Sequence, residues 1–538
     1  MTSQRNVAEF IIDQLAQWGV KNIFGIIGDS ILYFIDALAK QNSIKFYQVR
    51  HEESAALMAS AHAKLTGETG ICISDGGPGT LHLLNGLADA FIDCVPVIAI
   101  TGQVSRREIG TNAKQYVDQQ SLMRPIVSYT ALLSDQESTA QLLESAYRTA
   151  AGGRTTAHIS IPMDIFPLPC SAGVIPPSPF INTYPESSPE VIIGAMEMIK
   201  SSLRPVILAG AGSRSAGELV SELASQWGAA IISTLPGTGV VDSKHPLYAG
   251  GLGHAGSPAS EKILKQADLC LVIGANWWPS KYVPANIPII QIDRTPTNIG
   301  STTPVSYGIV GESGSILDKI LGMLDVTPNL EWIGIIKDEI QAWLEMLQNE
   351  ASGSNTPVHP ASIVKALQNN IPEDAVICLD TGDHAIWFGR VFRGANQRVI
   401  VSGKWRTMGF ALPAALAACI NAPGRKVIAL AGDGGFTMTM QEFLTAVRYS
   451  LPITVVVFNN SSLATEKNKM TAGGLDPAGT YLNNPDFASY ATNCGGLGIR
   501  VKHQEDLDSA LLEAINSSKP TLVDIITDSI AVPGTTMP

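Results

Sequence analysis

The sequence predicts an α/β fold with three domains and mainly parallel sheets. Short apolar runs typical of buried strands alternate with amphipathic helical segments along most of the 538 residues. Several runs end in glycine-rich turns, as expected at the carboxyl ends of parallel strands. A hydrophobic content of 45% is enough for several cores, and the length corresponds to roughly three or four domains of about 150 residues.

The first block, residues 1–172, begins with an amphipathic helix and then alternates strand and helix. Its strand candidates are VKNIFGIIG, KFYQVRH, TGICISD, VPVIAITG and AHISIP. The following segment, PLPCSAGVIPPSPFINTYPESSPE, is a linker, because its prolines cannot continue a helix or a central strand.

The second and third blocks repeat this alternation, so each of the three domains is expected to be Rossmann-like. Residues 188–345 contain RPVILAGAGS, GAAIISTLPG, DLCLVIGANWW and IPIIQIDRTP. The polar stretch ASGSNTPVHP leads into residues 356–538, whose strand candidates are DAVICLDTGD, KVIALAGDGG, ITVVVFNN and TLVDIIT.

Charge and composition exclude several classes of partner. The formal net charge is −12 and no basic tract occurs, which argues against nucleic acid or an anionic membrane surface. No apolar run approaches the roughly 20 residues that span a bilayer, and the N-terminus lacks the pattern of a signal peptide. The seven cysteines are scattered without metal-type spacing, as expected for reduced thiols in a cytoplasmic protein.

The most informative segment is AGDGGFTMTMQEFLTAVRYSLPITVVVFNN, a strand, turn, helix and second strand. Glycines in the turn let the backbone approach a ligand, and the helix N-terminus favours a phosphate there. Asp433 and Asn460 are separated by one helix and one strand, which returns the chain to the same sheet edge. They can supply oxygen ligands to Mg²⁺. The alternative is an ordinary α/β turn capped by an aspartate.

The GDG…NN pattern resembles the signature of thiamine diphosphate-dependent enzymes, and the resemblance extends over nearly the whole chain. The stretch GPGTLHLLNGLADAFIDCVPVIAITGQ is similar to pyruvate oxidases, quinone-dependent pyruvate dehydrogenases and acetolactate synthases. Its segment HLLNGL is most similar to the pyruvate oxidases. The resemblance implies a pyruvate oxidase/decarboxylase-like architecture. It also implies that Asp433, Asn460 and the Ser462 carbonyl bind magnesium, with Gly434 and Gly435 near the diphosphate.

Two further residues match the family's pattern. RHEE places the family's activating glutamate at Glu52, which the resemblance implies bonds the aminopyrimidine ring of thiamine diphosphate so that the thiazolium C2 loses its proton. The alternative is an acidic first helical turn that favours the helix dipole. TMGFALP places the apolar wedge under the cofactor at Met408, for which the alternative is core packing.

The resemblance also assigns roles to the three domains. Residues 1–172 would bind the thiamine pyrimidine, residues 356–538 would bind thiamine diphosphate and Mg²⁺, and residues 188–345 would be an FAD-type or structural domain. The candidate FAD residues lie in GGLGHAGS, GANWW and IIQIDRTP: Gly251, His254, Gly274, Trp278 and Asp293. Acids at strand ends are common in such domains, so a structural role is the alternative.

The chain departs from the quinone-dependent pyruvate oxidases after NN. SSLATEKNKM is expected to form the helix that covers the substrate, with polar Thr465, Glu466 and Lys467 where that family has apolar residues. A polar lid suits a hydroxyl, a charged substituent or a second substrate. The alternative is that Glu466 and Lys467 pair on a solvated face. His82 and His384 are expected to be buried histidines with satisfied hydrogen bonds.

The resulting hypothesis is an enzyme that decarboxylates a 2-oxo acid such as pyruvate and passes the electrons through FAD. The alternatives are a non-oxidative carboligase or decarboxylase of the acetolactate synthase type, and a non-catalytic paralogue. The resemblance implies a homodimer or homotetramer in which Glu52 and the GDG segment come from different subunits. Since the chain stops at SIAVPGTTMP, we expect no membrane-binding tail.

Overall fold

The computed structural model describes residues 5–177, 186–350 and 356–536, which include three six-stranded sheets. Parts of both predicted inter-block segments, residues 178–185 and 351–355, lie outside the described residues. All strand pairs that define these sheets are parallel. The predicted α/β class with parallel sheets is therefore confirmed.

The chain divides into two compact units. The first comprises Met1–Thr183, Ser402–Gly424 and Phe436–Ile453, and therefore contains the first sheet. The second comprises Tyr184–Val401, Arg425–Gly435 and Thr454–Pro538, with the second and third sheets.

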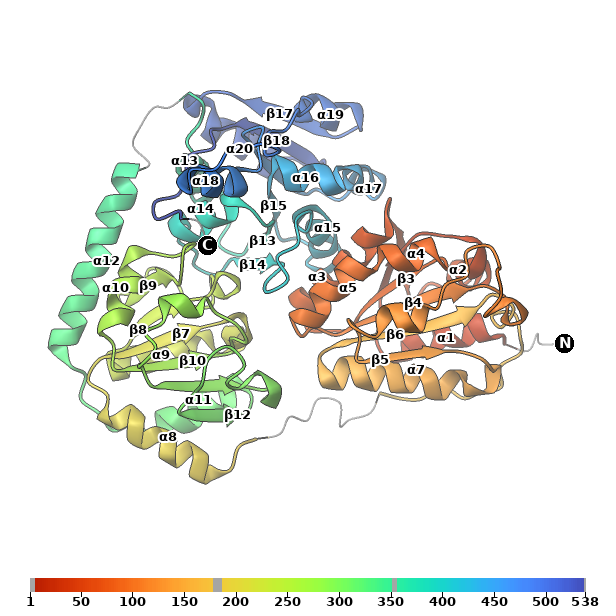
Figure 1. The fold of residues 1–538 in the computed structure, drawn as a ribbon, viewed down its shortest axis with the longest axis horizontal. Helices are drawn as coiled ribbons and strands as arrows, with labels where there is room; N and C mark the ends of the chain where they lie inside the picture. The colour runs from red at the N-terminus through yellow and green to blue at the C-terminus, as the bar shows by residue number, and fades with distance from the viewer. Residues whose placement is uncertain (1–4, 178–185, 351–355, 537–538) are drawn as a thin grey trace. The chain divides into compact units, whose positions relative to one another are not determined.

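The first sheet has the strand order β2-β1-β3-β4-β6-β5. Its strands are β1 Asn22–Gly25, β2 Lys45–Gln48, β3 Gly70–Ser74, β4 Val97–Gln103, β5 Tyr129–Leu132 and β6 Thr156–Pro162. The helices between them are α1 Val7–Gln17, α2 Leu32–Ala39, α3 Glu52–Thr66, α4 Pro78–His82, α5 Leu84–Ile92, α6 Gln119–Met123 and α7 Thr139–Tyr147. Helices α3 and α5 lie side by side (Figure 1). The predicted N-terminal helix is α1, which begins with an Asn6 capping box.

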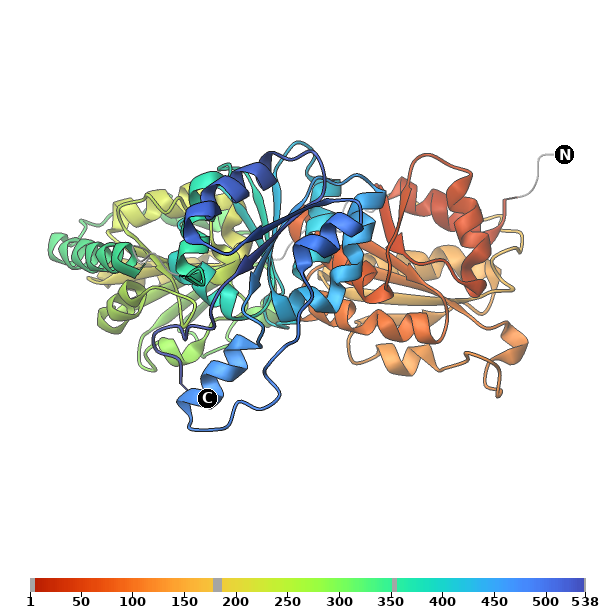
Figure 2. The same cartoon turned by 90° about the horizontal axis from the view of Figure 1, so that it is seen from above.

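The second sheet has the order β12-β11-β10-β7-β8-β9. Its strands are β7 Pro205–Ala209, β8 Ala230–Ser233, β9 Tyr248–Gly251, β10 Leu269–Ile273, β11 Ile289–Asp293 and β12 Tyr307–Val310. The accompanying helices are α8 Pro189–Ser201, α9 Gly217–Trp227, α10 Pro258–Gln266, α11 Ser313–Met323 and α12 Leu330–Glu350. The long helix α12 packs against α10 (Figures 1 and 2).

The third sheet has the order β14-β13-β15-β16-β18-β17. Its strands are β13 Val376–Leu379, β14 Arg398–Val401, β15 Val427–Gly432, β16 Thr454–Asn459, β17 Leu497–Val501 and β18 Thr521–Ile526. The helices of this part of the chain are α13 Pro360–Asn370, α14 Asp383–Val391, α15 Ala411–Asn421, α16 Asp433–Thr439, α17 Phe443–Arg448, α18 Ala464–Ala472, α19 Phe487–Asn493 and α20 Leu507–Asn516. The predicted GDGG turn is in fact the first turn of α16, and the single helix expected after it is divided between α16, a short 3-10 turn and α17.

Two whole-chain properties bear on the sequence predictions. The seven cysteines are all free thiols, and four of them, Cys72, Cys170, Cys270 and Cys378, are buried. Among the described residues, no helix is both long enough and apolar enough to cross a membrane.

Close packing in the first unit depends on glycine at one helix contact. A Cβ added at Gly86 of α5 would lie 2.5 Å from the Ala56 Cβ of α3, and within 2.6 Å of the α3 backbone. Helix α3 is buried along almost its whole length because it also packs against α15. The small residues of α3 and α5 therefore set the spacing between α3, which begins with Glu52, and α5, which begins two residues after His82.

We expect Gly86→Ala to lower the free energy of unfolding by roughly 1–3 kcal/mol, because the added methyl group overlaps backbone that cannot move away. Gly334→Ala in α12 is the matched control, since Gly334 is exposed with open space around it. That substitution should stabilise the protein by about 1 kcal/mol through helix propensity. Urea unfolding followed by circular dichroism measures both, and an equal response would contradict the packing argument.

Candidate active site

Adjacent parallel strands bring the two predicted metal ligands to the same edge of the third sheet. Strands β15 and β16 pair in register, with Gly432 opposite Phe458. Asp433 is the first residue after β15, and Asn460 is the first residue after β16. The carboxyl ends of both strands therefore present an oxygen-bearing side chain to one place.

Asp433 is held by a buried hydrogen-bond network. Its Oδ1 accepts from the Gly434 N–H at 2.9 Å, and its Oδ2 accepts from Asn484 Nδ2 at 2.8 Å. Asn484 Nδ2 also donates to Asn459 Oδ1, and Asn459 Nδ2 donates to Asp524 Oδ1 at 2.8 Å. Burial raises the pKa of Asp433, and the hydrogen bonds from Gly434 and Asn484 partly oppose that increase. Asn484 was not predicted, because it lies 51 residues from its partner in an irregular segment.

The segment after β16 is folded tightly around Asn460. The Asn460 Oδ1 accepts from both the backbone N–H and the hydroxyl of Ser462, each at 3.1 Å. Ser461 adopts a left-handed conformation with φ of 52°. This turn orients the Asn460 carboxamide and leads directly into α18.

Glycines at this edge permit close approach of protein groups. A Cβ added at Gly435 would lie 3.1 Å from the Asp380 carboxyl group, and one at Gly432 would lie 3.1 Å from His384 Nδ1. Gly435 therefore has a packing role of its own, in addition to the diphosphate contact that the sequence predicts.

The beginning of α14 carries polar groups without partners. Within the described residues, Thr381 Oγ1 and His384 Nε2 are buried and have no hydrogen-bond partner. Burial lowers the pKa of His384 to about 4, so the imidazole is neutral near pH 7. Gly382 caps the helix without a side-chain hydrogen bond, and of the first N–H groups that of Ala385 donates to the Gly382 carbonyl. His384 is buried as predicted, but its hydrogen bonding is not satisfied.

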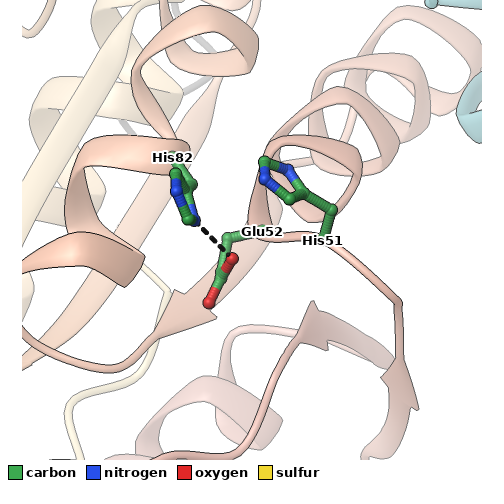
Figure 3. Close-up of side chains that lie close together, drawn as sticks. All are labelled: His51, Glu52 and His82. Carbon is green, nitrogen blue, oxygen red and sulfur yellow. Dashed lines mark hydrogen bonds and ion pairs between the residues drawn. The ribbon is translucent and has the colours of Figure 1, made fainter. Parts of the chain in front are cut away.

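Glu52 begins α3 and lies between two histidines (Figure 3). Its Oε2 is 2.9 Å from His82 Nδ1 at the end of α4. The Glu52 side chain is 14% exposed, whereas that of His82 is 45% exposed. The expectation of a buried His82 is therefore wrong, because α4 ends at the surface.

Two polar residues that the sequence did not reveal fix the backbone around Glu52. The Glu442 carboxylate accepts from the N–H groups of Arg50 and His51 at 3.0 and 3.1 Å. Asn85 Nδ2 donates to Glu53 Oε1 at 2.6 Å and to Thr407 Oγ1 at 2.8 Å. Since each bond spans hundreds of residues or joins separate helices, no local sequence pattern could have predicted them.

The loop before the proposed wedge is anchored to the same unit. Asp93, at the end of α5, accepts from the N–H groups of Gly403 and Lys404, each at 2.8 Å. Lys64 of α3 forms ion pairs of 2.7 Å with both Asp89 and Asp93. Met408 is partly buried four residues beyond Lys404, and it is separated from the buried start of α15 by Gly409 and Phe410.

The predicted lid segment forms helix α18, Ala464–Ala472. Thr465 Oγ1 and Asn468 Nδ2 are buried and have no hydrogen-bond partner in the part of the chain that the structure describes. Glu466 is exposed, and Lys467 donates to Ser529 Oγ at 2.6 Å. The two polar side chains that point away from water are thus Thr465 and Asn468, of which only Thr465 was predicted.

The candidate flavin residues are distributed over the carboxyl ends of the second sheet. Gly274 directly follows β10, Asp293 is the last residue of the neighbouring strand β11, and Gly251 is the last residue of β9. Gly274 has a φ of 61°, and a Cβ added at this position would lie only 2.4 Å from the Gly212 carbonyl carbon. Asp293 Oδ1 accepts from the Thr295 N–H at 2.8 Å.

Trp278 and His254 differ in their surroundings. Trp278 is 1% exposed within the hydrophobic core of the second sheet, and its indole N–H has no partner among the described residues. His254 Nε2 lies 3.3 Å from Thr535 Oγ1. Burial lowers the pKa of His254, with further lowering by Lys281, Arg390 and Lys469.

Comparison with known proteins identifies the family of this chain. Three family models match: "Thiamine pyrophosphate enzyme, N-terminal TPP binding domain" at residues 5–122, the "central domain" of the same enzymes at 192–320, and their "C-terminal TPP binding domain" at 380–525. The chain therefore belongs to the family of thiamine pyrophosphate-dependent enzymes.

Three relatives cover nearly the whole chain. The protein is 37% identical over 528 residues to the "Putative thiamine pyrophosphate-containing protein YdaP" of Bacillus subtilis, covering 97% of this chain and 92% of the relative. It is 30% identical to the pyruvate oxidase of Lactiplantibacillus plantarum, covering 98% and 89% of the two chains. It is also 30% identical to the acetolactate synthase isozyme 1 large subunit of Escherichia coli, covering 97% and 94%.

Asp383 gives the site a testable pH dependence. Burial raises its pKa to about 6, although Trp387 Nε1 donates to its Oδ2 at 3.1 Å. Because the folded state binds the proton more tightly than the unfolded state, the ionised carboxylate destabilises the fold at pH 7. That cost disappears as the pH falls through about 6 toward the unfolded value of 3.8.

We expect Asp383→Asn to raise the free energy of unfolding of the cofactor-free protein by roughly 1–3 kcal/mol at pH 7.5. The difference should be clearly smaller at pH 4.5, where the native Asp383 is protonated, and it should vanish only below pH 3.8, where the unfolded carboxyl group is protonated as well. Chemical denaturation of both proteins at the two pH values measures this difference in the free energy of unfolding. The asparagine amide oxygen retains an acceptor for Trp387 Nε1. A difference independent of pH would contradict the assignment.

Proposed function

We propose that the protein catalyses thiamine diphosphate- and Mg²⁺-dependent decarboxylation of a 2-oxo acid, pyruvate or a relative, with oxidation through FAD. The observation that carries the proposal is the buried Asp433 network beside Asn460, at the carboxyl edge of paired strands in a chain of this family. Its oxygens form a donor set for a hard cation that also binds phosphate.

The residues at this edge fit a magnesium diphosphate. Asp433, Asn460 and the Ser462 carbonyl would supply oxygen to Mg²⁺. The Thr381 hydroxyl, which has no hydrogen-bond partner among the described residues, is suited to a phosphate oxygen, whereas the neutral His384 imidazole, hydrogen-bonded to the Asp380 backbone, offers Nε2 as an acceptor. The uncapped first turn of α14 adds backbone N–H groups and the positive end of the helix dipole. Gly434 and Gly435 would lie beside the diphosphate.

The proposed catalytic roles belong to Glu52 and Met408. Thiamine diphosphate supplies, when bound, an electron sink for the carbanion formed on loss of carbon dioxide. Glu52 would hold a proton at the aminopyrimidine ring nitrogen, and Glu442 fixes the backbone from which Glu52 extends. Met408 would support the bent cofactor from below. In this arrangement residues 1–172 bind the pyrimidine, and residues 356–538 bind the diphosphate and metal.

The oxidative part of the proposal rests on the second sheet, residues 188–345. Gly274 and Asp293 stand at the ends of adjacent strands, next to the point where the strand order reverses between β10 and β7. Dinucleotides bind at such switch points. Together with Gly251, His254 and Trp278, these residues are our candidates for the FAD site.

One observation favours a second candidate, a non-oxidative carboligase of the acetolactate synthase type. Thr465 and Asn468 on α18 bury hydrogen-bonding groups that nothing in the described residues satisfies. A substrate carrying an additional oxygen, or a second carbonyl substrate, would provide acceptors for them. Glu466 and Lys467 would then lie at the rim of the lid.

The visible spectrum separates the two candidates. An oxidase should purify yellow, and its flavin absorbance should bleach anaerobically on addition of a 2-oxo acid. A carboligase or decarboxylase would release carbon dioxide from the same panel of 2-oxo acids without bleaching. If the protein retains no flavin absorbance after incubation with excess FAD and removal of the free flavin, the oxidase is eliminated.

Substitutions at the two carboxylates test the cofactor assignment. We expect Glu52→Gln to lower kcat by about 10²–10⁴-fold, because the amide cannot exchange a proton with the ring. Calorimetry should still detect cofactor uptake in that variant. Asp433→Asn should instead abolish Mg²⁺-dependent uptake. Full turnover by Glu52→Gln would refute the role of the glutamate.

We further propose a cytoplasmic homodimer or homotetramer in which the two carboxylates of one site come from different copies. Ile27, Leu32, Tyr33 and Leu81 of the first unit are large apolar side chains with more than 40% of their surface exposed, as is typical of an interface. Leu81 precedes His82, so that surface reaches the Glu52 cluster.

Mixing the two inactive variants tests the shared site. After dissociation and random reassociation, mixed dimers would contain one site with both native carboxylates, and activity should recover to about a quarter of the wild-type value. Each variant treated alone is the control. Absence of recovery, with mixed dimers demonstrated by tagged subunits, would place both carboxylates in one chain.

A further inference from the structure

The cluster of His51, Glu52 and His82 has a donor set that differs from the oxygen ligands at Asp433. One ligand atom from each residue lies within 4.8 Å of the other two. Figure 3 shows the three side chains converging from the start of α3 and the end of α4. Two imidazoles and one carboxylate are donors typical of zinc and other late transition metals, whereas Mg²⁺ prefers oxygen alone.

The spacing of the cluster is close to that of a formed site. Ligand atoms about 2 Å from a zinc ion lie about 3 Å from one another. His82 Nδ1 and Glu52 Oε2 are already 2.9 Å apart, and the His51 and His82 rings are tilted by 32° with centroids 4.4 Å apart. His51 Nδ1 accepts from the Glu53 N–H at 3.3 Å and its side chain is 38% exposed, so His51 would complete three-fold coordination by turning toward the ion.

The surroundings favour a cation and give it access. Glu53 places a second carboxylate 3.9 Å from His51 Nδ1. The backbone that carries the cluster is fixed, because Glu442 accepts from the N–H groups of Arg50 and His51. An ion can reach the mostly buried Glu52 oxygen past the exposed edge of His82, and water can fill the remaining coordination positions.

We propose that His51, Glu52 and His82 form a transition-metal site that binds Zn²⁺ in the cofactor-free protein and thereby blocks Glu52. The ion takes the place of the hydrogen bond between His82 Nδ1 and Glu52 Oε2 and coordinates both atoms, and the proton of that bond leaves to solvent. Metal binding itself is independent of the proposed function. Its regulatory consequence rests on that function, since Glu52 cannot hold a metal and a proton for the aminopyrimidine together.

The test is a zinc titration of the full-length, metal- and cofactor-free protein, with a chromophoric chelator as competitor and thiols kept reduced. The wild type should bind one Zn²⁺ per chain, and excess Mg²⁺ should not displace it. His82→Gln and Glu52→Gln should each weaken binding by about tenfold or more. His503→Gln, at an exposed histidine outside the cluster, is the matched control and should not change it.

Equal zinc affinity in all four proteins, or no stoichiometric binding by the wild type, would overturn the site. Because His82 is exposed, its variant should retain the fold, which thermal unfolding confirms. A second titration measures uptake of thiamine diphosphate with Mg²⁺ before and after zinc loading. Zinc should reduce that uptake in the wild type and not in His82→Gln.

The outcomes distinguish the inference from the proposed function. If the cofactor never binds, even without zinc, the proposed function fails while the metal site stands on its own titration. If zinc binds at the cluster and cofactor uptake is unchanged, the regulatory role is overturned.

Discussion

The candidate site depends on the parallel pairing of β15 and β16. This pairing places Asp433 and Asn460 at one edge, and it requires that a carboxylate be buried there. Burial of an ionised group is expensive unless hydrogen bonds and counter-charges compensate it. Here Asn484 and Asn459 relay hydrogen bonds from Asp433 to Asp524 on the neighbouring strand β18, so that the whole edge is organised around one carboxylate. A divalent cation would complete the compensation.

In the first unit, the Glu52 carboxylate is held in position although it is not fully buried. Glu442 fixes the backbone before Glu52, and Asn85 joins Glu53 to the loop that leads to Met408. These contacts restrain the first turn of α3 while its side chain remains open to His82 and to a ligand. The proposed proton transfer and the proposed metal binding both use this restrained but partly exposed carboxylate.

The sequence predicted central strands well and edge strands poorly. Of the strands it missed, β5, β9, β12, β14 and β17, every one lies at the edge of its sheet. Central strands are covered on both faces and therefore read as continuous apolar runs. Edge strands have less apolar cover; β5 and β17, for example, consist mainly of half-buried residues. The expected class, three parallel α/β sheets, did not require the edge strands.

The same division holds for the site. Turn chemistry and strand spacing, which are local properties of the chain, predicted Asp433 and Asn460 at strand ends, and the family resemblance predicted Glu52 at a helix start. Only the tertiary structure identified Asn484, Glu442 and the exposed His82. Their hydrogen bonds join segments that are distant in sequence, and a long-range contact is decided by how helices and sheets pack, not by the residues that flank it.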